Sequence, residues 1–122
     1  IACAQDDAEA RARLEARGCE VLLLPNPNGK VELIDVMREL GRRKLNEIHV
    51  EAGFKLNGSL LREGCIDELL LYLAPTILGD SAQGMFNLPA LTQLDAGIKL
   101  KLHRMSQVGP DLRLLVRTRT ES

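Results

Sequence analysis

The hydrophobic periodicity of this sequence changes partway along the chain, and that change constrains the fold more than any other feature. Up to Pro75, segments with helical spacing alternate with short apolar runs that end at turn residues. This arrangement is typical of a sheet whose strands are joined by crossover helices. From Ile98 to Arg117, two segments instead alternate apolar and polar residues around the turn sequence QVGPD, which predicts an antiparallel hairpin. We therefore expect an α/β protein with a mostly parallel sheet, flanked by helices, and a C-terminal antiparallel hairpin.

The two patterns also place each helix and strand on the sequence. Gly18 and Gly64 follow helical segments and are expected to end them, because glycine readily adopts the left-handed conformation found after many helices. Residues 76–97 carry Gly, Pro and Asn at irregular intervals, which indicates a long loop. Helices are expected at 6–17, 31–43 and 55–64, a turn at 26–29, strands at 19–25, 46–52 and 67–75, and hairpin strands with Ile98, Leu100 and Leu102 on one face and Lys99, Lys101 and His103 on the other.

Composition excludes several classes of function. A formal net charge of −1 argues against a domain that binds nucleic acid through bulk charge, and an aromatic content of 2% without Trp argues against base stacking. No apolar run reaches the roughly 18 residues of a membrane-spanning helix. The chain of 122 residues has the size of one domain. The odd number and wide spacing of Cys3, Cys19 and Cys65 favour small apolar fillers in a reducing, cytoplasmic compartment, and the isolated His49 and His103 argue against a metal cluster.

The stretch HVEAGFKLNGSLL, residues 49–61, combines the features of a ligand site at the edge of a sheet. Ligands of open α/β sheets bind beyond the carboxyl ends of the parallel strands, where Glu51 is expected. Gly53 allows a close approach of the backbone, and the first turn of the following helix offers unpaired N–H groups to a phosphate or pyrophosphate. Gly58 and Ser59 keep that surface low and add a hydroxyl donor. Glu51 can accept hydrogen bonds from a sugar hydroxyl or a heterocycle N–H.

Simpler interpretations of these and other residues stay open. Junctions of a strand, a glycine and a helix are common, and a Glu at the end of a strand is more often a solvated surface residue. Asp67 and Glu68 suggest a carboxylate pair, but neighbours on a strand point to opposite faces, so we expect them to pair with basic residues instead. Tyr72 is expected in the core with its hydroxyl at the rim. A solvated strand face is expected for Arg113, Arg117 and Arg119.

The segment VEAGFKLNGSLLREGCIDELLLYLAPTILGD, residues 50–80, resembles the signature of the reductase domain of the bifunctional riboflavin-biosynthesis deaminase/reductase family. Members of that family have a strand that ends in Glu-(Gly/Ala)-Gly, then a helix, then a DEL…Y.AP…LG pattern. GMFNLPAL (84–91) and VGPDLRL (108–114) also resemble the C-terminal end of the family's domain. The matching positions in the central segment are Glu51, Ala52, Gly53, Leu61, Gly64, Asp67, Glu68, Leu69, Tyr72, Ala74, Pro75, Leu78 and Gly79.

The resemblance implies a dihydrofolate-reductase-like, three-layer fold and an NADPH-dependent reductase that is commonly a homodimer. Its small-molecule substrate would be the phosphoribosylamino-pyrimidine 5-amino-6-(5-phosphoribosylamino)uracil, whose ribosyl group is reduced to a ribityl chain. In the family, the residue matching Glu51 contacts the substrate, and no catalytic residue is assigned. Phe54 departs from the family, whose members often have Pro or a small residue there, and we expect it to pack outward or onto the following helix. The residues that would contact NADPH are Gly53, Phe54, Lys55, Leu56, Asn57, Gly58 and Ser59.

The resemblance also predicts that residues 1–122 are the C-terminal portion of the reductase domain. We expect the N-terminal part of that domain to be missing from these residues. The two-part zinc-binding deaminase signature, H-x-E together with P-C-x-x-C, is also incomplete, because HVE (49–51) matches only its first half and no P-C-x-x-C occurs in the sequence. We therefore expect no reductase turnover from these residues alone. Two other functions are kept as alternatives. One is a non-catalytic dimerisation or assembly module that uses the edge of the hairpin at 98–117, and the other is a related pterin or folate reductase on the same scaffold.

Overall fold

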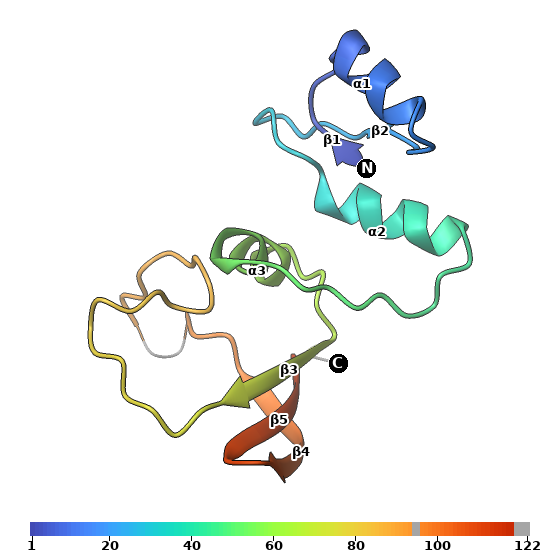
Figure 1. The fold of residues 1–122 in the computed structure, drawn as a ribbon. Helices are drawn as coiled ribbons and strands as arrows, with labels where there is room; N and C mark the ends of the chain where they lie inside the picture. Colours follow the sequence, from blue (N-terminus) through green and yellow to red (C-terminus); the bar gives the residue numbers. More distant parts are fainter. Residues whose placement is uncertain (94–95, 119–122) are drawn as a thin grey trace. The chain divides into compact units, whose positions relative to one another are not determined.

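The computed structural model describes residues 1–93 and 96–118, whose helices and strands are drawn in Figure 1. The chain divides into two compact units, Ile1–Val50 and Glu51–Ser122. Arg119, which we expected on a strand face, lies outside the described residues. None of the helices in the described ranges is long and apolar enough to span a membrane.

The first unit contains a parallel pair of short strands joined by a helix. β1 (Ala2–Cys3) pairs with β2 (Leu22–Leu23), and α1 (Ala8–Glu15) connects them. The helix begins at Asp7, whose side chain accepts a hydrogen bond from the backbone N–H of Ala10 at 2.9 Å. An acidic side chain at this position is favourable because it satisfies an N–H group that has no partner within the helix.

The second half of this unit follows the prediction in outline. The strand expected at 19–25 is confirmed only over the length of β2, and Leu23 is 45% exposed, because the short β1 offers few backbone groups for pairing. The turn at 26–29 is confirmed, with the Asn26 side chain accepting hydrogen bonds from two later backbone N–H groups at 2.9 Å. The expected helix after it is α2 (Leu33–Arg42).

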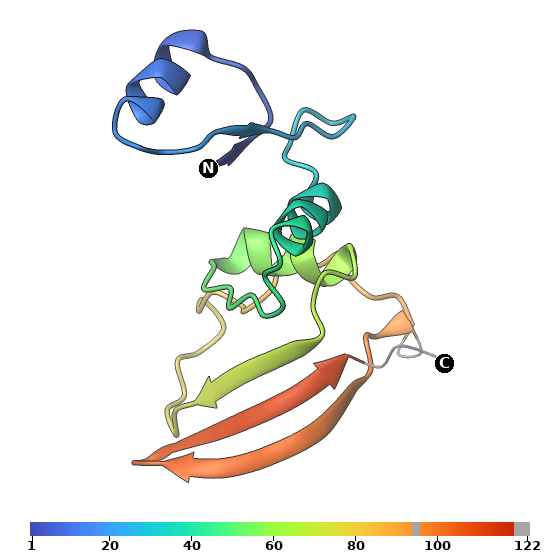
Figure 2. The same cartoon turned by 90° about the vertical axis from the view of Figure 1, so that its right-hand side faces the viewer.

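The described residues of the second unit form a helix and a three-stranded antiparallel sheet. α3 (Phe54–Arg62) is followed by β3 (Glu68–Leu73), β4 (Leu100–Val108) and β5 (Asp111–Thr118). The last strand, β5, lies between the other two and pairs antiparallel with both, as Figure 2 shows.

The α/β class and the C-terminal hairpin are confirmed, while the direction of the pairing differs from the expectation in part. Gly109, with φ of 60°, lies in the hairpin turn and suits the first central position of a type II′ turn. In the part of the chain that the structure describes, parallel pairing is limited to β1 and β2. The partner of β3 is β5, the second strand of the hairpin, and it runs antiparallel to β3.

The strand predicted at 46–52 is wrong, because the structure assigns neither helix nor strand to these residues. Ile48 and Val50, whose alternation suggested a strand, are 38% and 45% exposed. An extended segment becomes a strand only when neighbouring backbone groups pair with it, and no strand of the described chain pairs with these residues.

A residue with positive φ follows the end of each of α1, α2 and α3: Gly18 at 80°, Lys44 at 64° and Gly64 at 67°. The two glycines confirm the predicted helix ends. Lys44 was not foreseen, since a lysine in the left-handed region carries a steric cost that glycine avoids. The amide after each of these residues closes the final turn, in the bonds Cys19 N–Leu14 O (3.1 Å), Leu45 N–Leu40 O (3.2 Å) and Cys65 N–Leu60 O (2.9 Å).

A β-bulge at His103 corrects the alternation expected for the hairpin. Leu102 lies opposite Val116, but the next paired residue is Arg104, opposite Leu115. His103 is therefore the extra residue of the bulge, and strict alternation along β4 is interrupted there. The bulge keeps Arg104 off the apolar face, which consists of Leu69, Leu71, Leu73, Leu100, Leu102, Met105, Leu112, Leu114 and Val116.

The core of the second unit is small. Among the residues described, the buried apolar side chains are Leu60 of α3, which is 3% exposed, and Val116 of β5, which is 6% exposed. Much of the apolar face of the sheet remains accessible, for example Leu102 at 55% and Met105 at 62%.

Candidate functional site

The residues predicted to bind ligands lie consecutively at the start of the second unit. Glu51 and Gly53 are exposed, and Gly53 is the N-cap residue of α3, with φ of −91° and ψ of 174°. This extended conformation is available to any residue, so the backbone angles do not require a glycine there. A Cβ atom on Gly53 would meet nothing within 4 Å, which shows that the helix start is open to an approaching group.

The first turn of α3 has the electrostatic character of an anion site. The earliest backbone bond of this helix joins the N–H of Asn57 to the carbonyl of Gly53 at 3.0 Å. The N–H groups of Phe54, Lys55 and Leu56 precede it and have no acceptor within the helix. No acidic side chain lies in this first turn, and the Lys55 side chain is exposed. A phosphate at this end would meet backbone donors, the positive end of the helix dipole and a basic side chain.

The remaining predicted cofactor residues face a different part of the molecule. The side-chain amide of Asn57 donates to the carbonyl of Met85 at 3.4 Å. Gly58 is buried, and a Cβ atom there would lie 2.3 Å from the backbone oxygen of Asn87. Gly58 therefore serves a close contact between helix and loop, and this contact explains its small size better than a low ligand surface does.

Ser59 is hydrogen-bonded to Arg62, a residue that was not predicted from the sequence. Its hydroxyl oxygen accepts a hydrogen bond from Nη2 of Arg62 at 2.9 Å, while Nη1 of Arg62 donates to the carbonyl oxygen of Asn87 at 2.7 Å. The backbone N–H of Asn87 in turn donates to the carbonyl of Phe54 at 3.0 Å. The sequence does contain one signal of this contact. A glycine inside a helix costs roughly 1 kcal/mol relative to alanine, so the presence of Gly58 indicates that another part of the backbone approaches the helix there.

The ring of Phe54 lies close to Gly84, a neighbour that the prediction did not include. The prediction had it pack outward or onto the following helix. A Cβ atom on Gly84 would lie 3.8 Å from Cε2 of Phe54, and Phe54 is partly buried, so the ring lies beside the loop that follows β3. The side chain and the carbonyl of Phe54 thus both contact the same short loop segment.

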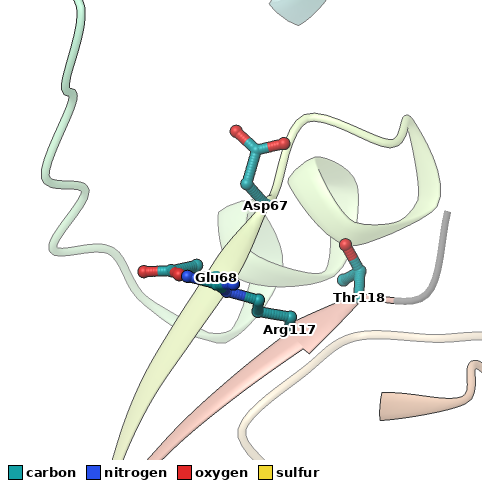
Figure 3. Close-up of a pocket in the computed structure, with 4 residues that line it drawn as sticks. All are labelled: Asp67, Glu68, Arg117 and Thr118. Carbon is teal, nitrogen blue, oxygen red and sulfur yellow. The ribbon is translucent and has the colours of Figure 1, made fainter. Parts of the chain in front are cut away.

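A shallow depression at the edge of the sheet is lined by Asp67, Glu68, Arg117 and Thr118 (Figure 3). Glu68 forms an ion pair with Arg117, with Oε1 and Nε 2.6 Å apart, which confirms the predicted basic partner of Glu68. Figure 3 shows Asp67 pointing away from this pair, so the two carboxylates do not act together. The hydroxyl of Thr118 donates to the carbonyl of Ile66 at 2.7 Å. These contacts hold the start of β3 beside the end of β5.

Tyr72 corrects another expectation, because it is 54% exposed and does not belong to the core. The register of β3 against β5 explains why Tyr72 is exposed. Tyr72 lies opposite Arg113, and Glu68 lies opposite Arg117, so the tyrosine is on the charged face of the sheet and its neighbours Leu71 and Leu73 are on the apolar face.

Arg43 forms a network of ion pairs with two glutamates in the first unit. Both terminal nitrogens of Arg43 contact the carboxylate of Glu20, one of them at 2.6 Å, and its Nε contacts Glu39 at 2.8 Å. The hydrogen bond from Arg43 holds the pKa of Glu20 below its ordinary value, and Glu20 and Glu39 together raise the pKa of Arg43. This network fastens the end of α2 to the segment before β2. Within the described residues, no three His, Cys, Asp or Glu side chains gather to form a metal site.

Comparison with known proteins places these features in a family. A family model described as the RibD C-terminal domain matches residues 1–114. The riboflavin biosynthesis protein RibD of Haemophilus influenzae is 44% identical over 96 residues, which are 79% of this chain and 25% of that protein. A Buchnera aphidicola protein named 5-amino-6-(5-phosphoribosylamino)uracil reductase is 34% identical over 89 residues, which are 73% of this chain and 43% of that protein.

Solved structures give the same result for the fold. Acinetobacter baumannii RibD, form 1, matches with a TM-score of 0.80 at 30% identity, over 90% of this chain and 29% of that chain. This likeness confirms the predicted dihydrofolate-reductase-like class. The chain spans 25% of the length of its Haemophilus influenzae relative and also 25% of an Escherichia coli RibD that is 42% identical over 91 residues.

Proposed function

This chain belongs to the RibD C-terminal domain family, and from that membership we propose that the protein containing it is an oxidoreductase of riboflavin biosynthesis. The proposed reaction is the NADPH-dependent reduction of the ribosyl group of 5-amino-6-(5-phosphoribosylamino)uracil to a ribityl chain. The observation that carries this proposal is the family match over residues 1–114. It is supported by the reductase name of the Buchnera aphidicola relative.

The start of α3 fits the proposed cofactor. NADPH supplies a hydride when it is bound, and the protein contributes binding and orientation. Gly53 leaves open space at the helix start, and the backbone N–H groups of Phe54, Lys55 and Leu56 would receive the phosphates, helped by the charge of Lys55. Of the other predicted contacts, Asn57, Gly58 and Ser59 would act mainly by holding the helix and its neighbouring loop together.

Glu51 is the proposed substrate residue. It is exposed and precedes the N-cap of α3 by two positions, so its carboxylate lies close in sequence to the proposed phosphate site. An ionised carboxylate accepts hydrogen bonds and does not donate them, which suits the hydroxyl groups of a sugar or the N–H groups of a pyrimidine. Its proposed role is to orient the substrate while the helix start holds the cofactor.

A homodimer is proposed on a separate observation. β4 is an edge strand of the described sheet, and the adjoining apolar face exposes Leu102 and Met105 by more than half. Exposed apolar surface and an unpaired edge both favour association with a second copy. Cys3, Cys19 and Cys65 form no disulfide among the described residues, which supports a reducing, cytoplasmic location. Light scattering on the full-length protein tests the dimer, and a strictly monomeric protein would contradict it.

The reaction itself is tested with the purified full-length protein. We expect NADPH to be oxidised in the presence of 5-amino-6-(5-phosphoribosylamino)uracil, with a ribityl product identified by mass spectrometry. Dihydrofolate and dihydropterin, offered in parallel, test the alternative of a folate or pterin reductase on the same scaffold. Preferential turnover of either alternative substrate would overturn the proposed function.

A further inference from the structure

We propose that Arg62 is a positioning residue for the first turn of α3, acting through the loop segment 84–87. The inference rests on the proposed function of that turn as the phosphate site of NADPH. Arg62 lies at the opposite end of the helix and has no place in the proposed contacts with cofactor or substrate. Its effect is transmitted by the backbone of Asn87.

Asn87 is held against one face of α3 by three residues spaced four apart. Its N–H donates to the carbonyl of Phe54 at 3.0 Å, and its carbonyl accepts from Nη1 of Arg62 at 2.7 Å. Gly58 lies between these two bonds and leaves room for the loop backbone, because any Cβ atom there would overlap it. Residues at i, i+4 and i+8 share one face of a helix, so the three contacts together hold the backbone of Asn87 on that face.

The guanidinium of Arg62 is well suited to holding Asn87, because it can make two hydrogen bonds at once. While Nη1 binds Asn87, Nη2 donates to the hydroxyl oxygen of Ser59 at 2.9 Å. The second bond fixes the direction of the planar group, and two nitrogens in a rigid fork make both contacts at once. A lysine has one ammonium group at this position and cannot reproduce that geometry.

The same loop segment also reaches the first turn of the helix. Gly84 lies beside the ring of Phe54, and the carbonyl of Met85 accepts from the side chain of Asn57 at 3.4 Å. The residue that follows the N-cap therefore contacts the loop through its ring and through its carbonyl. If the loop is released, the first turn loses these external supports and frays more readily. A phosphate then binds only after the turn has been ordered again, which weakens its affinity.

The test compares Arg62→Gln and Arg62→Lys with Arg38→Gln in the full-length protein. Arg38 is a matched control, because it is an exposed helical arginine whose ion pair, with Asp35 at 3.1 Å, lies within α2. Loop release is measured without cofactor, as hydrogen–deuterium exchange of peptides covering 84–88. NADPH affinity is measured by the fluorescence of the bound nucleotide, in the absence of substrate, so that neither reading depends on turnover.

We expect Arg62→Gln to accelerate exchange in the loop and to weaken NADPH binding by about fivefold, which corresponds to ordering roughly one further residue on binding. Arg62→Lys should fall between Arg62→Gln and the wild type in both measurements, and Arg38→Gln should match the wild type. Unchanged exchange, or faster exchange with unchanged NADPH affinity, overturns the positioning role and leaves the proposed function standing. A wild-type protein that binds no NADPH overturns the proposed function itself, and the inference with it.

Discussion

The backbone oxygen of Asn87 lies so close to Gly58 that a Cβ atom there would be 2.3 Å away, with the nitrogen and carbonyl carbon of Asn87 at 2.7 and 2.8 Å. Alanine ordinarily stabilises a helix interior by about 1 kcal/mol relative to glycine. At this position the helix or the loop must move, and overpacking of this kind costs about 1–3 kcal/mol. We expect Gly58→Ala to lower the free energy of unfolding by up to about 2 kcal/mol, measured by urea denaturation.

Gly41 provides the control for this prediction. It also lies inside a helix, α2, but a Cβ atom there would meet nothing within 4 Å. Gly41→Ala should therefore raise the free energy of unfolding, by up to about 1 kcal/mol. The contact between Gly58 and Asn87 is refuted if the two alanine variants change stability in the same direction.

Lys44 is a site where the sequence departs from the rule that the other two helix ends follow. Its φ of 64° is in the left-handed region, which costs a residue with a side chain roughly 1 kcal/mol more than glycine. We expect Lys44→Gly to stabilise the first unit by up to about 1 kcal/mol, seen as a higher midpoint of denaturation. Gly64→Ala is the converse experiment, because Gly64 has φ of 67°, and it should destabilise. A destabilising Lys44→Gly would show that the lysine side chain contributes more than its backbone costs.

These helix ends show which parts of the fold could be predicted from the sequence. Gly18 and Gly64 stop their helices through bonds within a few residues of each other, so a short window of sequence contains the cause. The hairpin was predictable for the same reason, since alternation and the turn at Gly109 are local signals. The strand expected at 46–52 failed because a strand depends on neighbours that the pattern of the segment itself does not specify.

The candidate site likewise has one part that could be predicted from the sequence and another that could not. The open helix start at Gly53 follows from a local motif, and the structure places it as an exposed N-cap. The hydrogen bond from Arg62 to Asn87 joins residues 25 positions apart. The bulge at His103 depends on the pairing of β4 with β5. No local periodicity encodes either arrangement. An interior glycine such as Gly58 marks that some backbone approaches it, but not which one.

The ion pair between Glu20 and Arg43 makes a prediction about pH. Arg43 holds the pKa of Glu20 below its ordinary value in the folded protein, so the unfolded chain binds a proton more readily than the folded one. The stabilising contribution of Glu20 is therefore fully present above its unfolded pKa and is lost as the pH falls through the lower, folded pKa. We expect Glu20→Gln to be less stable than the wild type near neutral pH, and the difference to shrink on acidification.

Urea denaturation of both proteins from about pH 7 down to about pH 3, bracketing the ordinary range of a glutamate pKa, checks this prediction. Because the pair is exposed, added salt should also reduce the difference near neutral pH. A stability difference that stays constant over the whole pH range would show that the effect of Glu20 is not electrostatic.

The open start of α3 gives the most direct test of the proposed cofactor site. Gly53→Asp puts a negative charge where the phosphates of NADPH are proposed to bind, and a repulsion of about 1.4 kcal/mol already weakens binding tenfold. The substitution should not harm the helix, because Asp is a favourable N-cap residue and the backbone angles of Gly53 suit any side chain. Gly53→Ala is the matched control, since its Cβ atom meets nothing within 4 Å. We expect Gly53→Asp to weaken NADPH binding to the full-length protein by roughly tenfold or more and to keep its thermal stability, while Gly53→Ala changes NADPH binding much less. Equal NADPH affinity in the aspartate and alanine variants would mean that the phosphates bind elsewhere.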